Sequence, residues 1–186
     1  MTESEIIKGC IKQDRNCQKA LYEMFYGKMM GVCLRYAKDR DHAQDVLQDA
    51  FMKVFDKIKN FNSTGSFEGW VRRIMVNTAI DALRKNKQEY SIVSTVHAQK
   101  RNEDPEEETS DDDILNHVTK EDVLNAVHKL SPAYRAVFNL YVVEEYSHKE
   151  IAEMLGISEG TSKSNFAKAK YNLKKLLIHL IPQAND

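Results

Sequence analysis

The sequence predicts an all-α protein made of two small helical domains, which a flexible acidic linker joins. Glycine and proline, which interrupt helices, number only seven and three among 186 residues. Apolar residues recur at the spacing of amphipathic helices in both halves of the chain. Between the halves, residues 103–113 (EDPEEETSDDD) contain no apolar and no basic residue, and such a segment cannot bury enough surface to fold by itself. We therefore expect domains at residues 1–89 and 117–186, with the linker at residues 90–116.

The N-terminal domain is expected to begin with three helices. The Thr2-x-x-Glu5 pattern matches a capping box, which places the first helix start at residue 2 or 3. Further apolar stripes run through residues 21–36 and 43–58, and the second of these has a wide apolar face at i, i+3, i+4 and i+7. Three polar residues lie partly off this apolar stripe, and from the residues alone we interpret them as solvated: Asp45, Gln48 and Asp49.

A loop and a fourth helix are expected to complete this domain. Residues 60–65 (NFNSTG) consist mostly of turn-forming residues. Ser66 then caps a helix whose inner face includes Trp70, which we interpret as a core residue. The outer face of this helix is polar and carries Arg72, Arg73, Asn77, Asp81, Arg84 and Lys85.

The C-terminal domain is expected to contain at least four helices. Thr119 is suited to cap the first. Ser131-Pro132 marks the start of the second, because proline is favoured at the first helical position after a capping serine. The third begins at the capping box Ser147-x-x-Glu150, and the last follows it after a short turn.

The last two helices match a helix-turn-helix. Gly156 fits the left-handed position that ends a helix, and Ser158 fits the cap of the next one. In such a pair the second helix enters the major groove of DNA with its N-terminal turns. The residues expected to face away from the core there are Thr161, Lys163, Ser164, Asn165 and Lys168. A solvated basic hairpin is the alternative, and the matching caps with small residues beside them favour DNA binding.

No cofactor, metal site or membrane insertion is expected. Cys10, Cys17 and Cys33 have no metal-ligand spacing, so we interpret them as reduced thiols of a cytoplasmic protein. One E-x-x-H pattern, Glu145 to His148, has no second copy of the kind that di-iron sites use. The sequence has no apolar run of transmembrane length and no signal peptide pattern. It also lacks a glycine-rich phosphate loop and a nucleophile–histidine pair, so we do not expect an enzyme.

Three segments together resemble a known family. SPAYRAVFNLYVVEEYSHKEIAEMLGISEGTSKS is similar to sigma region 4, HAQDVLQDAFMKVFDKIKNF to region 2.2, and SFEGWVRRIMVNTAIDALRKNK to regions 2.3 and 2.4. In this order, and with a linker between them, they make the chain resemble the extracytoplasmic-function (ECF) sigma factors of the sigma-70 family. The resemblance implies a promoter-specificity factor that binds core RNA polymerase and directs transcription initiation.

The resemblance also implies partners and site residues for the N-terminal domain. The expected partners are the β′ clamp helices and β flap of core polymerase, promoter DNA, and an anti-sigma factor. The clamp helices would be bound by Asp45, Gln48 and Asp49. The minus-ten element, as a single strand, would be bound by Asn62, Ser63, Arg72, Arg73, Asn77, Arg84 and Lys85.

For the C-terminal domain, the resemblance implies recognition of the minus-thirty-five element as a duplex. The matching residues are Thr161 on phosphate and Lys163, Ser164, Asn165, Ala167 and Lys168 in the groove. Many members of the family have valine in place of Ser162 and arginine in place of Asn165 and Lys168. Because arginine reads guanine with a bidentate fork and lysine acts as a point charge, the base preference is left open.

The sequence leaves open both the role of the linker and the class of protein. The acidic linker either threads toward the polymerase active centre as a mimic of RNA or is a solvated spacer. A stand-alone helix-turn-helix regulator and a sigma-like interaction decoy are the alternatives to a sigma factor. The former needs a dimer surface and an effector pocket, and neither is evident; the latter needs no cationic DNA surface.

Overall fold

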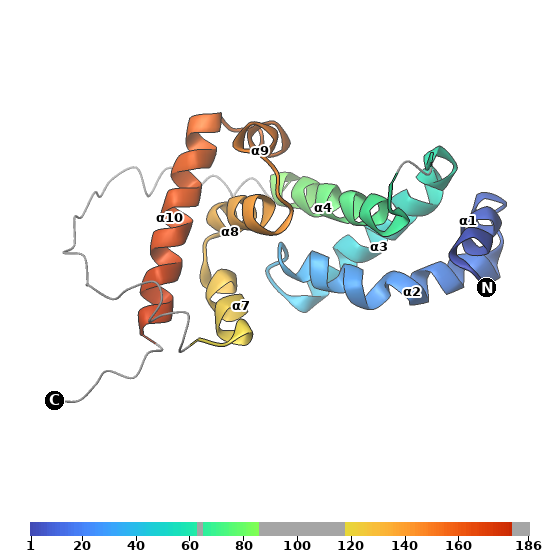
Figure 1. Cartoon of the computed structure of the whole chain (residues 1–186), viewed down its shortest axis with the longest axis horizontal. Helices are drawn as coiled ribbons and strands as arrows, with labels where there is room; N and C mark the ends of the chain where they lie inside the picture. The colour runs from blue at the N-terminus through green and yellow to red at the C-terminus, as the bar shows by residue number, and fades with distance from the viewer. Residues whose placement is uncertain (63–64, 86–117, 180–186) are drawn as a thin grey trace. The chain divides into compact units, whose positions relative to one another are not determined.

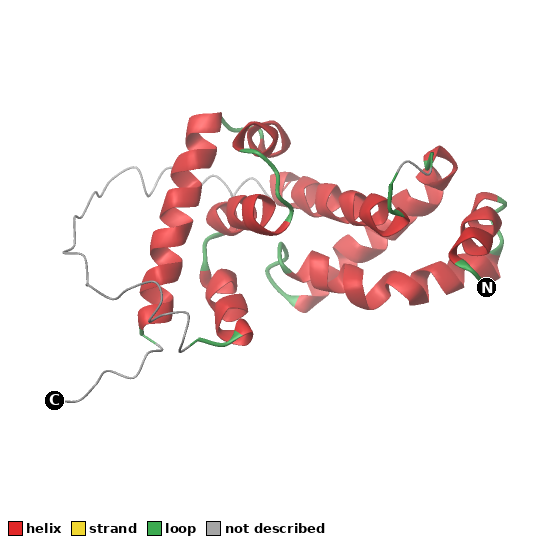
Figure 2. Cartoon of the chain, viewed as in Figure 1, coloured by secondary structure: helices red, strands yellow, loops and turns green. Residues whose placement is uncertain are grey.

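The computed structural model describes residues 1–62, 65–85 and 118–179. These residues form helices and connecting loops and contain no strand (Figure 2), which confirms the predicted all-α class. The chain divides into two compact units, residues 1–85 and 86–186. The linker predicted at residues 90–116 lies outside the described residues.

Three packed helices form the centre of the first unit (Figure 1). Helix α2 (Arg15–Leu34) packs against α3 (Arg40–Lys57) and α4 (Phe67–Lys85), and α3 also packs against α4. Helix α1 (Glu3–Ile11) packs on α2 and on the short 3-10 turn η1 (Ile58–Asn60). The largest fully buried side chains of this unit include Leu21, Met29, Tyr36, Leu47, Val54, Ile58, Val71 and Met75.

Short polar side chains start the helices of the first unit. The predicted capping box of α1 is present, with the Thr2 amide donating to Glu5 Oε2 at 2.8 Å. Asp39 caps α3 by accepting a hydrogen bond from the His42 amide at 2.8 Å. Ser66 accepts one from the Gly69 amide at 3.1 Å at the start of α4, as predicted. Each bond satisfies a backbone donor that the first helical turn leaves without a partner.

The described part of the second unit is built around its last and longest helix. Helix α10 (Glu159–Ile178) packs against α7 (Lys120–Lys129), α8 (Pro132–Phe138) and α9 (His148–Leu155). A π-helical turn, η2 (Asn139–Val143), continues α8 toward α9. The core between α7, α8 and α10 contains Ala126, Val127, Leu130, Tyr134, Ala169 and Leu173.

The predicted caps of the second unit are all present. Thr119, Ser131, Ser147 and Ser158 each accept a hydrogen bond from a backbone amide in the first turn of the helix that follows. Gly156 ends α9 at φ 68° and ψ 38°, the left-handed region that glycine adopts without steric cost. The local sequence therefore fixes where the helices of the helix-turn-helix begin and end.

Candidate DNA and polymerase interfaces

The helix-turn-helix consists of α9, a short turn and α10. The capping box at Ser147 starts α9, with the Ser147 amide and hydroxyl both donating to Glu150 Oε2, at 2.8 and 2.7 Å. After Gly156, the Ile157 amide donates to the Ala152 carbonyl at 3.1 Å, which closes the turn onto α9. The Ser158 hydroxyl then accepts from the Thr161 amide at 3.0 Å and starts α10.

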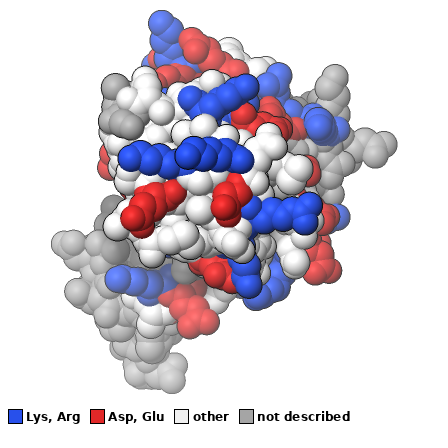
Figure 3. All heavy atoms as spheres, turned by 90° about the vertical axis from the view of Figure 1, so that its right-hand side faces the viewer, with Lys and Arg blue, Asp and Glu red and all other residues white. Residues whose placement is uncertain are grey.

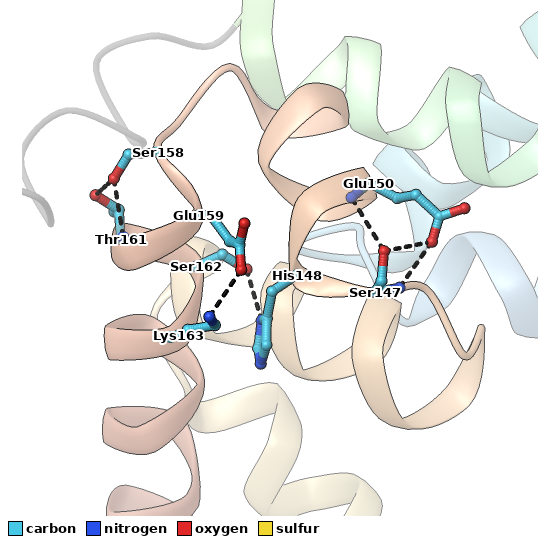
Figure 4. A network of polar contacts seen from close by, with 8 residues as sticks. All are labelled: Ser147, His148, Glu150, Ser158, Glu159, Thr161, Ser162 and Lys163. Atoms are coloured by element: carbon cyan, nitrogen blue, oxygen red, sulfur yellow. Dashed lines mark hydrogen bonds and ion pairs between the residues drawn. The ribbon is translucent and has the colours of Figure 1, made fainter.

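A hydrogen bond joins the two helices of this motif. His148 Nδ1 lies 3.0 Å from the Ser162 hydroxyl oxygen (Figure 4), and the Ser162 side chain is fully buried. The His148 ring stacks on Tyr141 with centroids 4.5 Å apart, and Tyr141 also contacts Phe166 at 4.5 Å. His148 thus connects η2, α9 and α10, and so helps to set the orientation of α10 relative to α9.

The residues predicted on the outer face of α10 differ in accessibility. Thr161, Lys163, Ser164 and Ala167 are exposed. Asn165 and Lys168 are half-buried, and Lys168 is engaged in an interaction within the protein. The accessible face is therefore narrower than the sequence predicted and extends from the first into the third turn of α10.

One residue on this face was not predicted as a site residue. Glu159 Oε1 lies 2.7 Å from Lys163 Nζ (Figure 4), one helical turn away along α10. The hydrogen bond and charge of Lys163 lower the pKa of Glu159. The i, i+4 spacing of Glu159 and Lys163 is visible in the sequence, and it is the signal from which the pair could have been predicted.

The three polar residues of α3 lie together on one accessible face. Asp45, Gln48 and Asp49 are all exposed, and their i, i+3 and i+4 spacing places them side by side on the helix surface. Met52, one turn further along the same face, is 63% exposed. The apolar stripe in the sequence did not single out Met52, which lies on the face of α3 opposite to the buried side chains.

Aromatic rings at the two ends of the loop before α4 pack together. Phe61 contacts Phe67 at 5.0 Å and Trp70 at 5.6 Å between ring centroids, so residues on both sides of the loop pack together. Trp70 stacks on Phe67 at 5.7 Å and is half-buried, so its predicted core position is only partly correct. Asn62 is exposed, and Ser63 lies outside the described residues.

The outer face of α4 is cationic and accessible. Arg73, Asn77, Arg84 and Lys85 are exposed, while Arg72 is half-buried and engaged within the protein. The acid on this face, Asp81, is paired with Lys53 of α3 at 3.5 Å. Arg73 and Arg84 are therefore exposed on the helix that begins directly after the loop.

The surface charge is mixed rather than segregated on the face drawn in Figure 3, where Lys and Arg side chains lie among Asp and Glu.

Among the described residues, no group of three or more His, Cys, Asp or Glu side chains is arranged to hold a metal ion. No helix in the described ranges is long and apolar enough to cross a membrane. The three cysteines are free, and burial raises the pKa of Cys33 to about 12.

Two family models match the two units. Sigma-70 region 2 matches residues 21–89, and sigma-70 region 4 matches residues 120–173. The chain therefore belongs to the sigma-70 family of RNA polymerase sigma factors, and its role is that of a sigma factor in transcription initiation. The relatives place it among the ECF sigma factors, as the three sequence segments had indicated.

The relatives are similar along nearly their whole length. The chain is 27% identical over 176 residues to the ECF RNA polymerase sigma factor SigW of Bacillus subtilis, covering 92% of this chain and 94% of that protein. It is 27% identical to the RNA polymerase sigma-H factor of Pseudomonas aeruginosa, covering 98% and 97%. Among solved structures, the sigma factor RpoE from Bartonella quintana, in complex with the anti-sigma factor NepR, has a TM-score of 0.51 at 22% identity, covering 86% of this chain and 96% of that one. This likeness shows a shared fold.

Proposed function

We propose that this sigma factor binds core RNA polymerase through residues 1–89 and contacts promoter DNA with both units. Residues 117–186 would bind the minus-thirty-five element as a duplex, and α4 with its preceding loop would bind the minus-ten element as a single strand. Residues 90–116 would connect the two. The chain would have no catalytic activity of its own, because the polymerase performs nucleotidyl transfer, and it would act in the cytoplasm.

The observation that carries this proposal is the helix-turn-helix of α9 and α10. Its exposed N-terminal residues are small or polar, so the backbone of α10 can approach the base edges closely. The contacts would be made by Thr161 on phosphate and by Lys163, Ser164 and Ala167 in the groove, with Asn165 and Lys168 at its margin.

For the minus-ten element, the supporting observation is the exposed cations of α4, a helix that follows a loop with packed aromatic rings at its two ends. Single strands are bound by cations that follow the backbone together with stacked or pocketed bases. Arg73, Arg84 and Lys85 supply exposed cations, and Asn77 an exposed amide. Asn62, Ser63 and Arg72 complete the proposed set.

For polymerase, the proposed contact is the exposed edge of α3. Asp45, Gln48 and Asp49 would bind the β′ clamp helices, and the second unit would contact the β flap. The acidic edge suits a protein partner better than a nucleic acid, because phosphates repel carboxylates. The exposed Met52 adds an apolar side chain beside this edge. An anti-sigma factor is a further proposed partner, since one solved sigma factor of this fold has an anti-sigma factor bound.

The direct test is run-off transcription. Purified core polymerase from the source bacterium would be incubated with fragments from upstream genomic regions, with and without this protein. We expect transcripts that depend on the protein and share two upstream motifs. Binding of duplex DNA without polymerase would instead indicate a stand-alone regulator, and polymerase binding without any transcript would indicate a decoy.

A second arm tests the polymerase contact. Replacing Asp45, Gln48 and Asp49 with alanine should weaken core binding while leaving the helical circular dichroism spectrum unchanged, because all three side chains are exposed. Glu23→Ala is the matched control, since it removes an exposed acid from α2 of the same unit. Equal core affinity of the triple variant and the unsubstituted protein would refute the contact.

A further inference from the structure

The first turns of α10 carry an ion pair on the accessible side of the recognition helix. Glu159 and Lys163 are joined at 2.7 Å, with 50% and 61% of their side chains exposed. The acid precedes the lysine by four residues, which is the favoured order for such a pair. Both groups are therefore available to a ligand and already oriented toward each other.

The surroundings hold the acid in its charged form and fix the backbone that carries the pair. The hydrogen bond and charge of Lys163 lower the pKa of Glu159, and electrostatic interactions with residues of α9, among them Lys149, lower it further. Ser162, which lies between the paired residues in the sequence, is buried against His148. The carboxylate is thus ionised at neutral pH and rests on a helix turn that is anchored to α9 (Figure 4).

A charged carboxylate on a DNA-facing helix can contact DNA favourably only where the DNA presents a hydrogen-bond donor. Phosphates repel Glu159, whereas the amino groups of bases in the major groove can donate to it. In a G·C pair, guanine presents O6 and N7 as acceptors and cytosine presents its N4 amino group as a donor. Adenine N6 is also such a donor, but adenine is usually read by asparagine or glutamine, whereas lysine usually donates to guanine O6 or N7 and a carboxylate accepts from cytosine N4. A lysine ammonium beside a carboxylate has the complementary pattern, a donor next to an acceptor.

We propose that Glu159 and Lys163 read one G·C base pair of the minus-thirty-five element as a unit. The Lys163 ammonium donates to guanine O6 or N7, and the Glu159 carboxylate accepts from cytosine N4. The pair stays intact in the complex, so neither charge is left without a partner in the groove. Glu159 is then a specificity-determining residue, and this inference rests on the proposed function of α10 in binding the minus-thirty-five element.

The test is a base-preference measurement with the full chain in holoenzyme. Promoter fragments with a randomised minus-thirty-five element would be selected by binding, for the unsubstituted protein, Glu159→Ala, Lys163→Ala and the double variant. We expect one position at which the unsubstituted protein prefers G·C by about tenfold, within the range of a good side-chain contact to a base. Each single substitution should reduce the preference at that same position, and the double variant should be no worse than either.

A matched control separates this effect from loss of charge or of helix stability. Glu121→Ala also removes an acid from the first turn of a capped helix, but α7 packs against the C-terminal half of α10, away from Glu159. The control should keep the G·C preference. If Glu159→Ala instead tightens binding to all sequences and steepens the salt dependence, the carboxylate only screens Lys163 and the proposal is wrong. If the unsubstituted holoenzyme shows no minus-thirty-five preference at all, the proposed function fails, and the two failures are distinguishable.

Discussion

Replacing Ser162 with alanine tests the bond that ties the recognition helix to α9. The substitution removes the 3.0 Å hydrogen bond between the Ser162 hydroxyl and His148 Nδ1. Ser162 is fully buried, while His148 is half-buried and its nitrogen can be rehydrated. The loss should therefore be that of an ordinary hydrogen bond, about 1 kcal/mol. For a domain of about 60–100 residues this lowers Tm by roughly 4–8 °C.

Two probes of thermal unfolding make the measurement specific to the second unit. Far-UV circular dichroism follows the helices of both units. Tryptophan fluorescence, excited at a wavelength that tyrosine does not absorb, follows the first unit alone, because the single tryptophan of the chain, Trp70, lies there. We expect Ser162→Ala to shift a circular dichroism transition and to leave the fluorescence transition in place.

A double-mutant cycle then assigns the loss to the hydrogen bond. His148→Phe removes the ring nitrogens and preserves a ring that can stack on Tyr141, which lies 4.5 Å from the imidazole. In the His148→Phe background, Ser162→Ala should cost less than half of what it costs alone. An equal cost in both backgrounds, or an unchanged Tm for Ser162→Ala alone, would show that this hydrogen bond does not stabilise the second unit.

Two further predictions concern the helix ends of the second unit. Gly156→Ala should lower the free energy of unfolding by about 1–2 kcal/mol in urea titrations, because a Cβ is disfavoured at φ 68°. An unchanged urea midpoint would mean that the turn relaxes to another backbone conformation without cost. Hydrogen bonds from Thr119 lower the pKa of Asp122 below its ordinary value of 3.8. These hydrogen bonds to the ionised Asp122 carboxylate stabilise the fold at pH values above 3.8, and they are lost as pH falls through the lower folded-state pKa. The Tm difference between the unsubstituted protein and Asp122→Asn should therefore shrink in acid, and a pH-independent difference would contradict the cap.

Local chemistry made most helix ends predictable. The capping boxes at Thr2, Thr119 and Ser147 depend on residues three positions apart, and all are formed in the structure. The left-handed Gly156 follows from the glycine itself. These features need no tertiary information, because their partners lie within one helical turn of each other.

The π turn after α8 was not predictable in the same way. Residues 139–143 (NLYVV) have an apolar pattern that continues the α-helix, yet the structure widens the helix there and follows it with Glu145 at φ 59°. This geometry brings Tyr141 against His148 and Phe166, which lie on other helices. The turn is thus specified by contacts between elements, and periodicity alone cannot reveal them.

The candidate sites were predictable as faces but not as contacts. The exposure of Asp45, Gln48 and Asp49 follows from the apolar stripe of α3, whose opposite side is buried. The half-burial of Asn165 and Lys168 depends on how closely α10 lies against its neighbours. The roles of these residues in binding polymerase and DNA are implied by the resemblance to the family, and the structure shows which of the residues are accessible.

The pairing of Ser162 with His148 also bears on how this recognition helix differs from its family. Where many members place valine, this chain has a buried hydroxyl with a ring nitrogen in reach, so a polar contact takes the place of apolar packing at the junction of α9 and α10. A hydrogen bond is directional, whereas apolar packing tolerates small rotations, so the angle of α10 should be more tightly defined. The lysine nearest to the start of α10 is already paired with Glu159, which leaves less net positive charge for sequence-independent attraction to phosphate. A fixed helix angle and a charge-balanced face both shift discrimination toward base contacts, and so toward promoters that match the helix closely.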